Sequence, residues 1–188
     1  ENEKKLKTFR KLVSKVDETV ISKRLWISSF DIHSFYVKRK VLTISLATMS
    51  MIGYVLGVGD RHLWNILLHL KTGKIAHIDY NVCFDKGKRL AIPETVPFRF
   101  TKIFRGAISP SNINLFKSTC CKVLVTMRQN RKTLIAILSK LEKCPLENWR
   151  KSCKKEILKV EEKLKNVFEI FAKFSLFELF VNATREFQ

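Results

Sequence analysis

The sequence predicts a mainly α-helical domain that contains one small β-hairpin. Hydrophobic residues make up 46% of its 188 residues, enough to bury the core of one domain. Only six Gly and four Pro interrupt the chain, which favours long helices with few loops. Apolar residues recur at helical spacing over most of its length, and two short apolar runs near the middle flank a turn that contains Gly.

The N-terminal half is dominated by two predicted helices. Residues 1–25 alternate charged and apolar positions with helical spacing, which predicts one amphipathic helix. Residues 25–31 form a linker whose Ser and Asp side chains are candidate N-caps. A long helix then runs from Ile32 to Leu56 and ends at Gly57. Its second half lacks charges, but four Ser and Thr interrupt it, so we expect a buried core helix and no transmembrane segment.

The middle and C-terminal regions differ in pattern. Two apolar runs, 66–70 and 75–78, flank a turn at 71–74 and predict a β-hairpin. Residues 80–101 are expected to be irregular. Helical spacing returns at 112–141, with a break near 128–131, and the segment 150–188 is predicted to form a basic amphipathic helix from residue 151 to residue 181. Its apolar side comprises Ile157, Val160, Leu164, Val167, Phe168 and Phe171.

The net charge of +19 would attract phosphate-bearing ligands, RNA or an anionic membrane surface. The basic residues are spread along the chain with little aromatic interleaving, unlike a nucleic-acid platform. We therefore interpret them as a surface covered by other parts of a longer chain, and we expect nucleic acid to be only an indirect partner.

Five Cys, an odd number with no CxxC pair, indicate neither a zinc site nor a disulfide framework. The N-terminus is charged throughout and resembles no signal peptide. Reduced thiols and this N-terminus favour a cytoplasmic or nuclear location. The chain also begins without Met, as a piece of a longer protein would.

Polar residues gather where the predicted hairpin opens. With the turn at 71–74, Asn65 and Asp79 lie almost opposite each other, with Cα atoms about 4.5–5.5 Å apart. An amide oxygen and a carboxylate are ligands suited to Mg²⁺, whose other positions are filled by water and substrate phosphates. Asp60 precedes Asn65 on the entering loop, where a carboxylate can accept a proton from an attacking hydroxyl. The alternative is a solvated turn cluster, and His69 and His77 are expected to be strand-surface or core residues.

The run Gly59-Asp60-Arg61-His62-x-x-Asn65, followed by His77-Ile78-Asp79, resembles the catalytic and metal-binding motifs of the phosphatidylinositol 3-/4-kinase superfamily. The activation segment, 79–101, is similar to that of its protein-kinase branch, the phosphatidylinositol-3-kinase-related kinases, and most similar to the members that act in nonsense-mediated mRNA decay. The resemblance covers residues 26–149, with a catalytic loop at 57–65 and a metal-binding segment at 77–81. It implies the C-terminal lobe of a PI3/PI4-kinase-like fold.

The resemblance also implies roles for individual residues. Asp60 would be the general base, and His62 would stabilise the transferring phosphate. Asn65 and Asp79 would hold Mg²⁺, with Mn²⁺ as the alternative cation, and Leu67 and Ile78 would form the floor under the adenine of ATP. The substrate would be a protein Ser or Thr followed by Gln. The partners would be the remaining kinase lobe, helical-repeat regions of a larger chain, and regulatory subunits.

Two departures from the family pattern leave alternatives open. Trp64 stands where relatives have a small or acidic residue, which predicts different packing beside Asn65. No Gly-rich phosphate loop with its ATP-binding Lys precedes residue 26, so the catalytic apparatus in these residues is expected to be incomplete. A non-catalytic interaction module and a phosphoinositide kinase therefore remain alternatives to a protein kinase.

Overall fold

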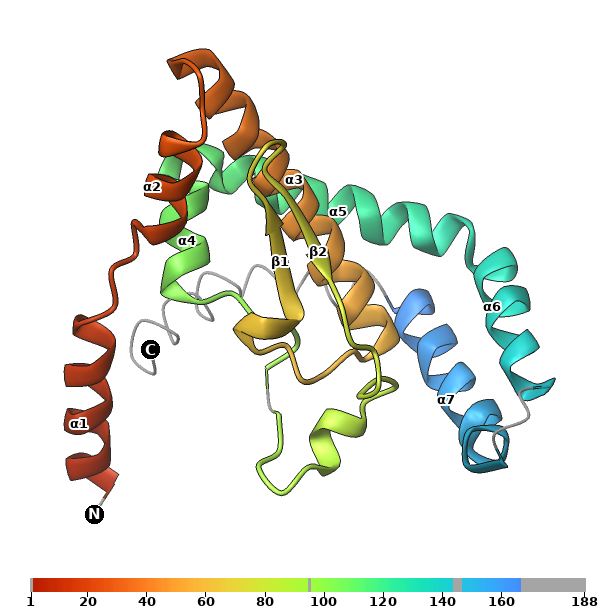
Figure 1. The fold of residues 1–188 in the computed structure, drawn as a ribbon. Helices are drawn as coiled ribbons and strands as arrows, with labels where there is room; N and C mark the ends of the chain where they lie inside the picture. The colour runs from red at the N-terminus through yellow and green to blue at the C-terminus, as the bar shows by residue number, and fades with distance from the viewer. Residues whose placement is uncertain (1, 95, 144–146, 167–188) are drawn as a thin grey trace.

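The computed structural model describes residues 2–94, 96–143 and 147–166, which are arranged around one long central helix, α3 (Ile32–Leu56) (Figure 1). The hairpin lies against one side of α3, and other helices pack along its length. The remaining helices and strands are α1 (Asn2–Ser14), α2 (Val20–Ile27), β1 (Ile66–His69), β2 (Lys74–His77), α4 (Lys102–Ile108), α5 (Ile113–Gln129), α6 (Arg131–Ser139) and α7 (Glu147–Lys165). Short 3₁₀ turns occur at Leu63–Asn65, Lys86–Arg89, Pro110–Asn112 and Lys140–Lys143.

Helix α3 begins and ends at the predicted residues. The Asp31 side chain accepts a hydrogen bond from the backbone N–H of Ser34 at 2.7 Å, and the Ser34 hydroxyl accepts one from the N–H of Asp31. This reciprocal cap satisfies N–H groups that have no partner within the helix. At the other end Gly57 adopts a left-handed conformation with φ of 61°, and Val58 N–H bonds back to the Gly53 carbonyl. The chain is thereby turned sharply into the following loop.

The core forms along the buried face of α3. Five fully or almost fully buried side chains follow one another at helical spacing, and they contact buried residues of α4, α5 and α7. This confirms the prediction of a core helix. Among the described residues, no helix has the length and apolar character needed to cross a bilayer. The five side chains are Leu42, Leu46, Ala47, Met51 and Val55.

The β-hairpin is confirmed, but its register differs from the prediction. Ile66 pairs with His77 and His69 pairs with Lys74, so the turn comprises residues 70–73 and not 71–74. Gly73, with φ of 78°, closes this turn and approaches the backbone of Lys38 so closely that a side chain would overlap it. The hairpin tip is thus packed onto α3, and this contact sets the register.

The prediction of a single N-terminal helix was wrong, because α1 and α2 are separated by residues 15–19. Asp17 causes the break. Its carboxylate accepts a hydrogen bond from the backbone N–H of Thr19 at 2.8 Å and pairs with Lys23, so it competes with the helical hydrogen-bond pattern. The expected linker at 25–31 is also shorter, since α2 continues to Ile27 and buries Leu25.

The C-terminal helices match the prediction in part. The expected break falls at Asn130, between α5 and α6. Helix α4 has no counterpart among the predicted elements, because it is only two turns long. Helix α7 begins at Glu147 and buries Ile157, Val160 and Leu164, as predicted. The predicted continuation to residue 181, with Val167, Phe168 and Phe171, lies outside the described residues.

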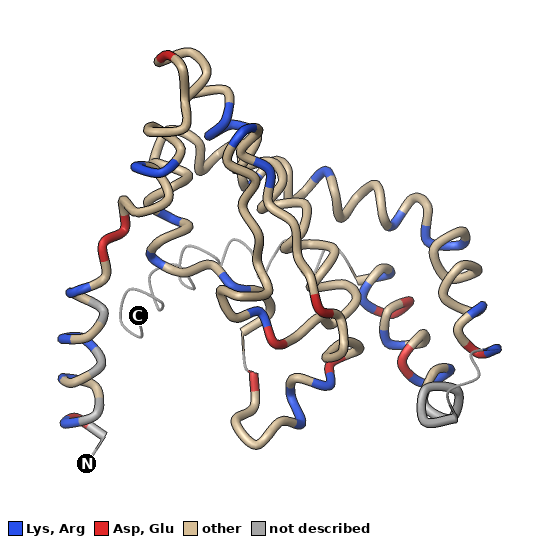
Figure 2. Tube along the Cα trace, in the orientation of Figure 1, with Lys and Arg blue, Asp and Glu red and all other residues tan. Residues whose placement is uncertain are grey.

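Basic residues are distributed over most elements and do not gather on one face (Figure 2). Some acidic positions lie at the open end of the hairpin and in the loop beneath it, and others lie on α7, between α1 and α2, and at the start of α3 (Figure 2). Those at the hairpin include Asp60 and Asp79 of the predicted site.

Candidate active site

The loop that leaves α3 is paired with the activation segment through three backbone hydrogen bonds. Gly59 N–H donates to the Val82 carbonyl at 2.8 Å, Phe84 N–H donates to Leu56, and Asp85 N–H donates to Gly57 at 2.9 Å. A Cβ atom on Gly57 would lie 2.4 Å from the nitrogen of Asp85. Glycine therefore serves both the left-handed turn and the close approach of the two segments.

Arg61 ties this loop to the end of the hairpin. Its side chain is buried, and its Nε donates to the Gly59 carbonyl at 2.7 Å. Nη1 donates to the Ile78 carbonyl at 2.8 Å, and Nη2 donates to the Asp79 carbonyl. The guanidinium also lies over the ring of Tyr80, 5.6 Å from its centroid. Because one rigid group binds three carbonyls, it fixes the position of Asp79 relative to the loop.

Three of the predicted site residues converge on the loop. Asn65 Nδ2 donates to the Asp60 carbonyl at 2.8 Å and lies 3.2 Å from His62 Nε2. The first bond fixes the orientation of the Asn65 amide, because an amide oxygen could not donate to that carbonyl. His62 Nε2 must then accept, with its proton on Nδ1. The same Nε2 lies 3.7 Å from the Asp60 carboxylate.

Asp79 lies almost opposite Asn65, as predicted, although the strands pair in a different register. Because the turn begins one residue earlier than predicted, Asn65 faces Ile78, whose N–H donates to the Asn65 carbonyl at 3.0 Å. Asp79 lies one residue further along, with φ of 55°, and its Oδ1 accepts a hydrogen bond from Asn81 N–H. Asn65 and Asp79 therefore lie one position out of register with each other, and Arg61 provides the link between their segments.

Asp60 and Asp79 both have left-handed backbone conformations, with φ of 55°. Such angles are uncommon outside glycine, and Asp and Asn tolerate them better than most residues. They occur preferentially at functional sites, where the surrounding structure holds the strained residue. In this chain the surrounding hydrogen bonds of Arg61 and Asn65 supply that constraint.

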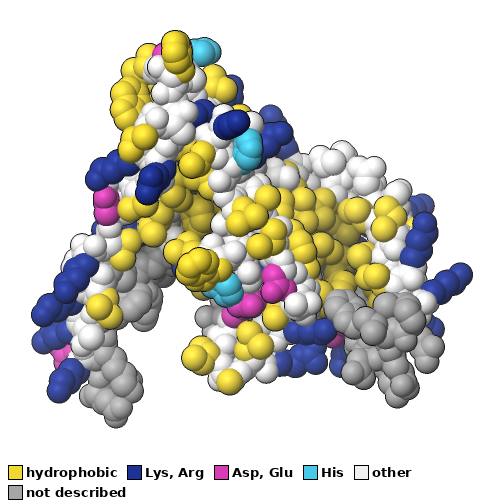
Figure 3. Space-filling view, viewed as in Figure 1, with side chains coloured by type: hydrophobic (Ala, Val, Ile, Leu, Met, Phe, Trp, Pro, Cys, Tyr) yellow, Lys and Arg dark blue, Asp and Glu magenta, His cyan; other side chains and the backbone are white. Residues whose placement is uncertain are grey.

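An apolar surface adjoins these polar residues. Leu67 and Ile78 lie on the outward face of the hairpin and are 48% and 42% exposed. Trp64 is 86% exposed, so it projects from the loop and does not alter the packing around the buried Asn65. In Figure 3, hydrophobic side chains surround the acidic and histidine groups at the base of the hairpin.

Glu94, for which the sequence suggested no role, holds the loop from the opposite side. Its Oε1 accepts a hydrogen bond from Asp60 N–H at 2.6 Å. Its carboxylate fills the space where side chains on Gly59 and Gly87 would stand, and its own N–H donates to the Gly87 carbonyl. The sequence signals for this contact were Gly59, Gly87 and the Pro93-Glu94 dipeptide, but they do not predict which loop the Glu94 carboxylate contacts.

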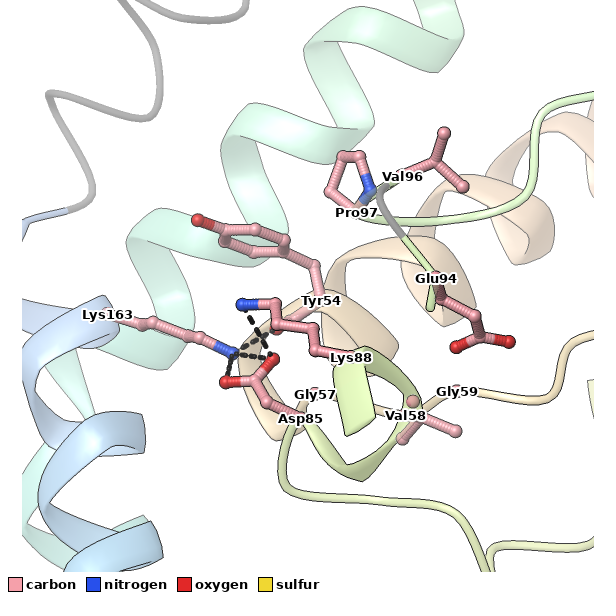
Figure 4. A pocket seen from close by; sticks show the side chains of 11 residues that line it. Tyr54, Gly57, Val58, Gly59, Asp85, Lys88, Glu94, Val96, Pro97 and Lys163 are labelled. Atoms are coloured by element: carbon pink, nitrogen blue, oxygen red, sulfur yellow. Dashed lines mark hydrogen bonds and ion pairs between the residues drawn. The ribbon is translucent and has the colours of Figure 1, made fainter. Parts of the chain in front are cut away.

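A cavity of about 170 Å³ lies behind the loop, between the activation segment and α7 (Figure 4). Lys163 of α7 reaches into it, 3.0 Å from Asp85, and Lys88 lies 3.4 Å from the same carboxylate. Burial would raise the pKa of Asp85, but the two lysines outweigh it and lower that pKa. Burial lowers the pKa of Lys163 although Asp85 opposes the change.

His69 and His77 have the structural positions predicted for them. His69 Nδ1 lies 2.7 Å from the Thr72 hydroxyl at the exposed hairpin tip. His77 faces inward, and its Nε2 is buried without a hydrogen-bond partner in the described part of the chain. Burial, together with the charge of Arg61, lowers the pKa of His77 to about 4. His77 is therefore neutral near pH 7.

A loop that carries Asp60, a hairpin and an Asp just beyond the second strand together define the C-terminal lobe of a protein-kinase-like fold. Comparison with known proteins agrees. Residues 1–151 match the family described as phosphatidylinositol 3- and 4-kinase. The chain belongs to this family, and its relatives place it with the phosphatidylinositol-3-kinase-related protein kinases.

The relatives are much longer than this chain. Serine/threonine-protein kinase smg-1 of Caenorhabditis briggsae is 45% identical over 142 residues, which are 75% of this chain and 6% of the relative. The probable serine/threonine-protein kinase smg1 of Dictyostelium discoideum is 41% identical over 150 residues, 79% of this chain and 6% of its own length. The solved structure "FAT and kinase domain of CtTel1" superposes with a TM-score of 0.78 and 30% identity, covering 87% of this chain and 12% of that one.

Proposed function

We propose that this chain is the metal-holding lobe of an ATP-dependent protein kinase that phosphorylates Ser or Thr. The observation that carries the proposal is the convergence of Asp60, His62 and Asn65 on one loop, with Asp79 tied to that loop by Arg61. Serine/threonine-protein kinases among the relatives support the same reaction class.

The available donors suit Mg²⁺, with Mn²⁺ as a substitute. The Nδ2 of Asn65 is committed to Asp60, which leaves Oδ1 as the ligand atom, and Asp79 supplies a carboxylate. No group of three or more His, Cys, Asp or Glu suited to a metal occurs among the described residues. Two oxygen donors fit a cation that also binds substrate phosphates, whose charge it offsets.

The chain's own residues would handle the proton and the acceptor. The side chain of Asp60 is 43% exposed, so its carboxylate can take the proton of an attacking Ser or Thr hydroxyl. The hydroxyl oxygen then bonds to the γ-phosphorus of ATP, and the bond to the bridging oxygen breaks. His62 lies beside Asp60 and would donate a hydrogen bond to the transferring group through Nδ1. Leu67 and Ile78 would support the adenine on the apolar surface of the hairpin.

The finer proposal concerns substrate and setting. We propose a Ser or Thr followed by Gln as the acceptor, because the activation segment at 79–101 is similar to that of the protein-kinase branch. Nonsense-mediated mRNA decay, or another genome or RNA surveillance process, in the cytoplasm or nucleus would be the setting. The remaining kinase lobe, helical-repeat regions and regulatory subunits would be the partners.

The test measures phosphoryl transfer by the full-length natural chain with Mg-ATP. Asp79→Asn retains a side chain that tolerates the left-handed backbone but removes the negative charge. We expect a loss of about a hundredfold or more in kcat with a Ser-Gln peptide. Asp17→Asn is the matched control, because Asp17 lies between α1 and α2, and its partners Thr19 and Lys23 are close to it in sequence.

Undiminished peptide phosphorylation by Asp79→Asn would refute the assigned roles. Turnover of phosphoinositide vesicles without peptide turnover would move the assignment to a lipid kinase. Binding of Mg-ATP without turnover of either would identify a non-catalytic interaction module. Equal rates on Ser-Gln and Ser-Ala peptides would remove the Gln preference alone.

A further inference from the structure

Helix α7 carries a lysine that reaches the activation segment. Lys163 Nζ lies 3.0 and 3.1 Å from the two carboxylate oxygens of Asp85 and donates to the Tyr54 carbonyl at 3.1 Å (Figure 4). It also lies over the Tyr54 ring, 5.4 Å from the centroid. Both members of the ion pair are largely buried, with 19% and 18% of their side chains exposed. One ammonium group thus joins α7, the end of α3 and the activation segment.

A second charged contact lies about two helical turns away on α7. Glu156 is 6% exposed, and its Oε1 lies 3.3 Å from Arg89 Nη2 in the activation segment. Its Oε2 lies 2.8 Å from Lys159 on the same helix. A carboxylate as buried as this one is stable only when it is paired. Both contacts therefore connect α7 to residues 85–89.

Hydrogen bonds connect these contacts to Asp60, the proposed general base. Asp85 N–H donates to the Gly57 carbonyl at the start of the catalytic loop. Further along the activation segment, Glu94 N–H donates to the Gly87 carbonyl, and the Glu94 carboxylate accepts from Asp60 N–H at 2.6 Å. A shift of residues 85–89 would therefore displace this loop at two points, Gly57 and Asp60.

The ion pairs are not needed to attach α7 to the domain. Apolar side chains already do so, since Ile157, Val160 and Leu164 are at least 95% buried. Buried ion pairs add little net stability compared with apolar contacts, but they can fix one arrangement over others. Their geometry points to positioning of the activation segment and not to attachment of the helix.

We infer that Lys163 and Glu156 of α7 are positioning residues that hold the activation segment, and through it Asp60, in place. This inference rests on the proposed function, and it extends the site beyond residue 151, where the family match ends. Neither residue touches a reacting atom.

The experiment compares Lys163→Met, Lys163→Arg and Lys165→Met in the full-length natural chain. Met keeps the length of the side chain and removes its charge. Lys165 is the matched control, because its ion pair with Glu161 at 2.8 Å lies within α7 and 57% of its side chain is exposed. A thermal melt verifies folding of each variant, and Glu156→Gln provides a second test if Lys163→Met does not fold.

Two measurements decide the outcome. In Lys163→Met, amide hydrogen exchange at Asp85, Glu94 and Asp60 should rise about tenfold, and kcat should fall about tenfold with the KM for ATP unchanged. Lys163→Arg should restore most of both. Lys165→Met should change neither.

The inference fails if Lys163→Met leaves amide exchange at these three residues unchanged, or slows catalysis no more than Lys165→Met. The exchange measurement needs no catalysis. Faster exchange in a chain without kinase activity would therefore support the positioning role and refute the proposed function alone.

Discussion

On its hairpin side the loop that carries Asp60 is held by a buried guanidinium that donates to backbone carbonyls, whereas on its other side it is held by backbone hydrogen bonds and by the Glu94 carboxylate. The acceptors of Arg61 are the carbonyls of Gly59, Ile78 and Asp79, which do not titrate. On the other side, Glu94 accepts a hydrogen bond from Asp60 N–H, and Asp85 is a carboxylate whose pKa is lowered by neighbouring lysines against the effect of burial. The two sides should therefore differ in how much stability they provide and in the pH at which they lose it.

The largest effect is expected on the hairpin side. Arg61→Met would leave three carbonyls without their donor, and at least one buried acceptor would remain unsatisfied. We expect the free energy of unfolding to fall by about 3 kcal/mol. Urea denaturation monitored by circular dichroism measures this loss. A fall as small as that of Glu94→Ala would mean that both sides hold the loop equally.

A second effect is the pH dependence of folding stability on the hairpin side, where His77 ends β2. The folded chain keeps His77 neutral until about pH 4, whereas in the unfolded chain His77 takes up a proton near its ordinary value of 6.5. The unfolded state therefore binds more protons between these values, and stability is lost as the pH falls from about 6.5 to about 4. We expect a loss of about 2 kcal/mol over this range.

His77→Leu should abolish this part of the pH dependence, because Leu has no proton to bind. Denaturation midpoints at pH 7 and pH 4.5 provide the comparison. Asp85, whose pKa is lowered in the folded chain, keeps its contribution above its ordinary value of 3.8 and loses it only as the pH falls further. A slope that persists in His77→Leu between pH 6.5 and 4 would show that another group is responsible.

The smallest effect is expected on the activation-segment side. Glu94→Ala removes the acceptor of the Asp60 N–H group and should cost about 1 kcal/mol of folding stability. Glu94→Gln keeps an oxygen acceptor and serves as the control, with little change expected. Urea midpoints of the two variants provide the measurement. Equal losses would mean that the negative charge, and not the hydrogen bond, holds this side.

Local patterns predicted the elements that local interactions determine. The ends of α3 follow from Asp31 and Gly57, whose caps involve only neighbouring residues. The hairpin follows from its apolar runs and Gly73. The hairpin turn lies one residue earlier than predicted, because its position depends on the approach of Gly73 to Lys38, a contact with α3 that no local pattern contains.

The residues of the site also divide into those that a local motif predicts and those that only the folded chain brings together. The spacing within the motifs identified Asp60, His62 and Asn65, which the structure places on one loop. The residues that hold the loop had no such signal. Glu94 lies 34 positions from Asp60, and Lys163 lies 78 positions from Asp85, so only the folded chain reveals these partners. Asp17 similarly interrupts a predicted helix, because its carboxylate accepts a hydrogen bond from the backbone N–H of Thr19.

The buried guanidinium of Arg61 has a further electrostatic consequence. Its hydrogen-bond partners are carbonyl dipoles, and within the described residues no carboxylate lies in ion-pair range of it, so its positive charge is not cancelled by a neighbouring anion. Burial, and after it the charge of Arg61, lowers the pKa of His77. Asp60 precedes Arg61 in the chain, and the Asp79 carbonyl accepts a hydrogen bond from the guanidinium. Arg61 thus places a permanent positive charge beside the backbone of both acidic residues.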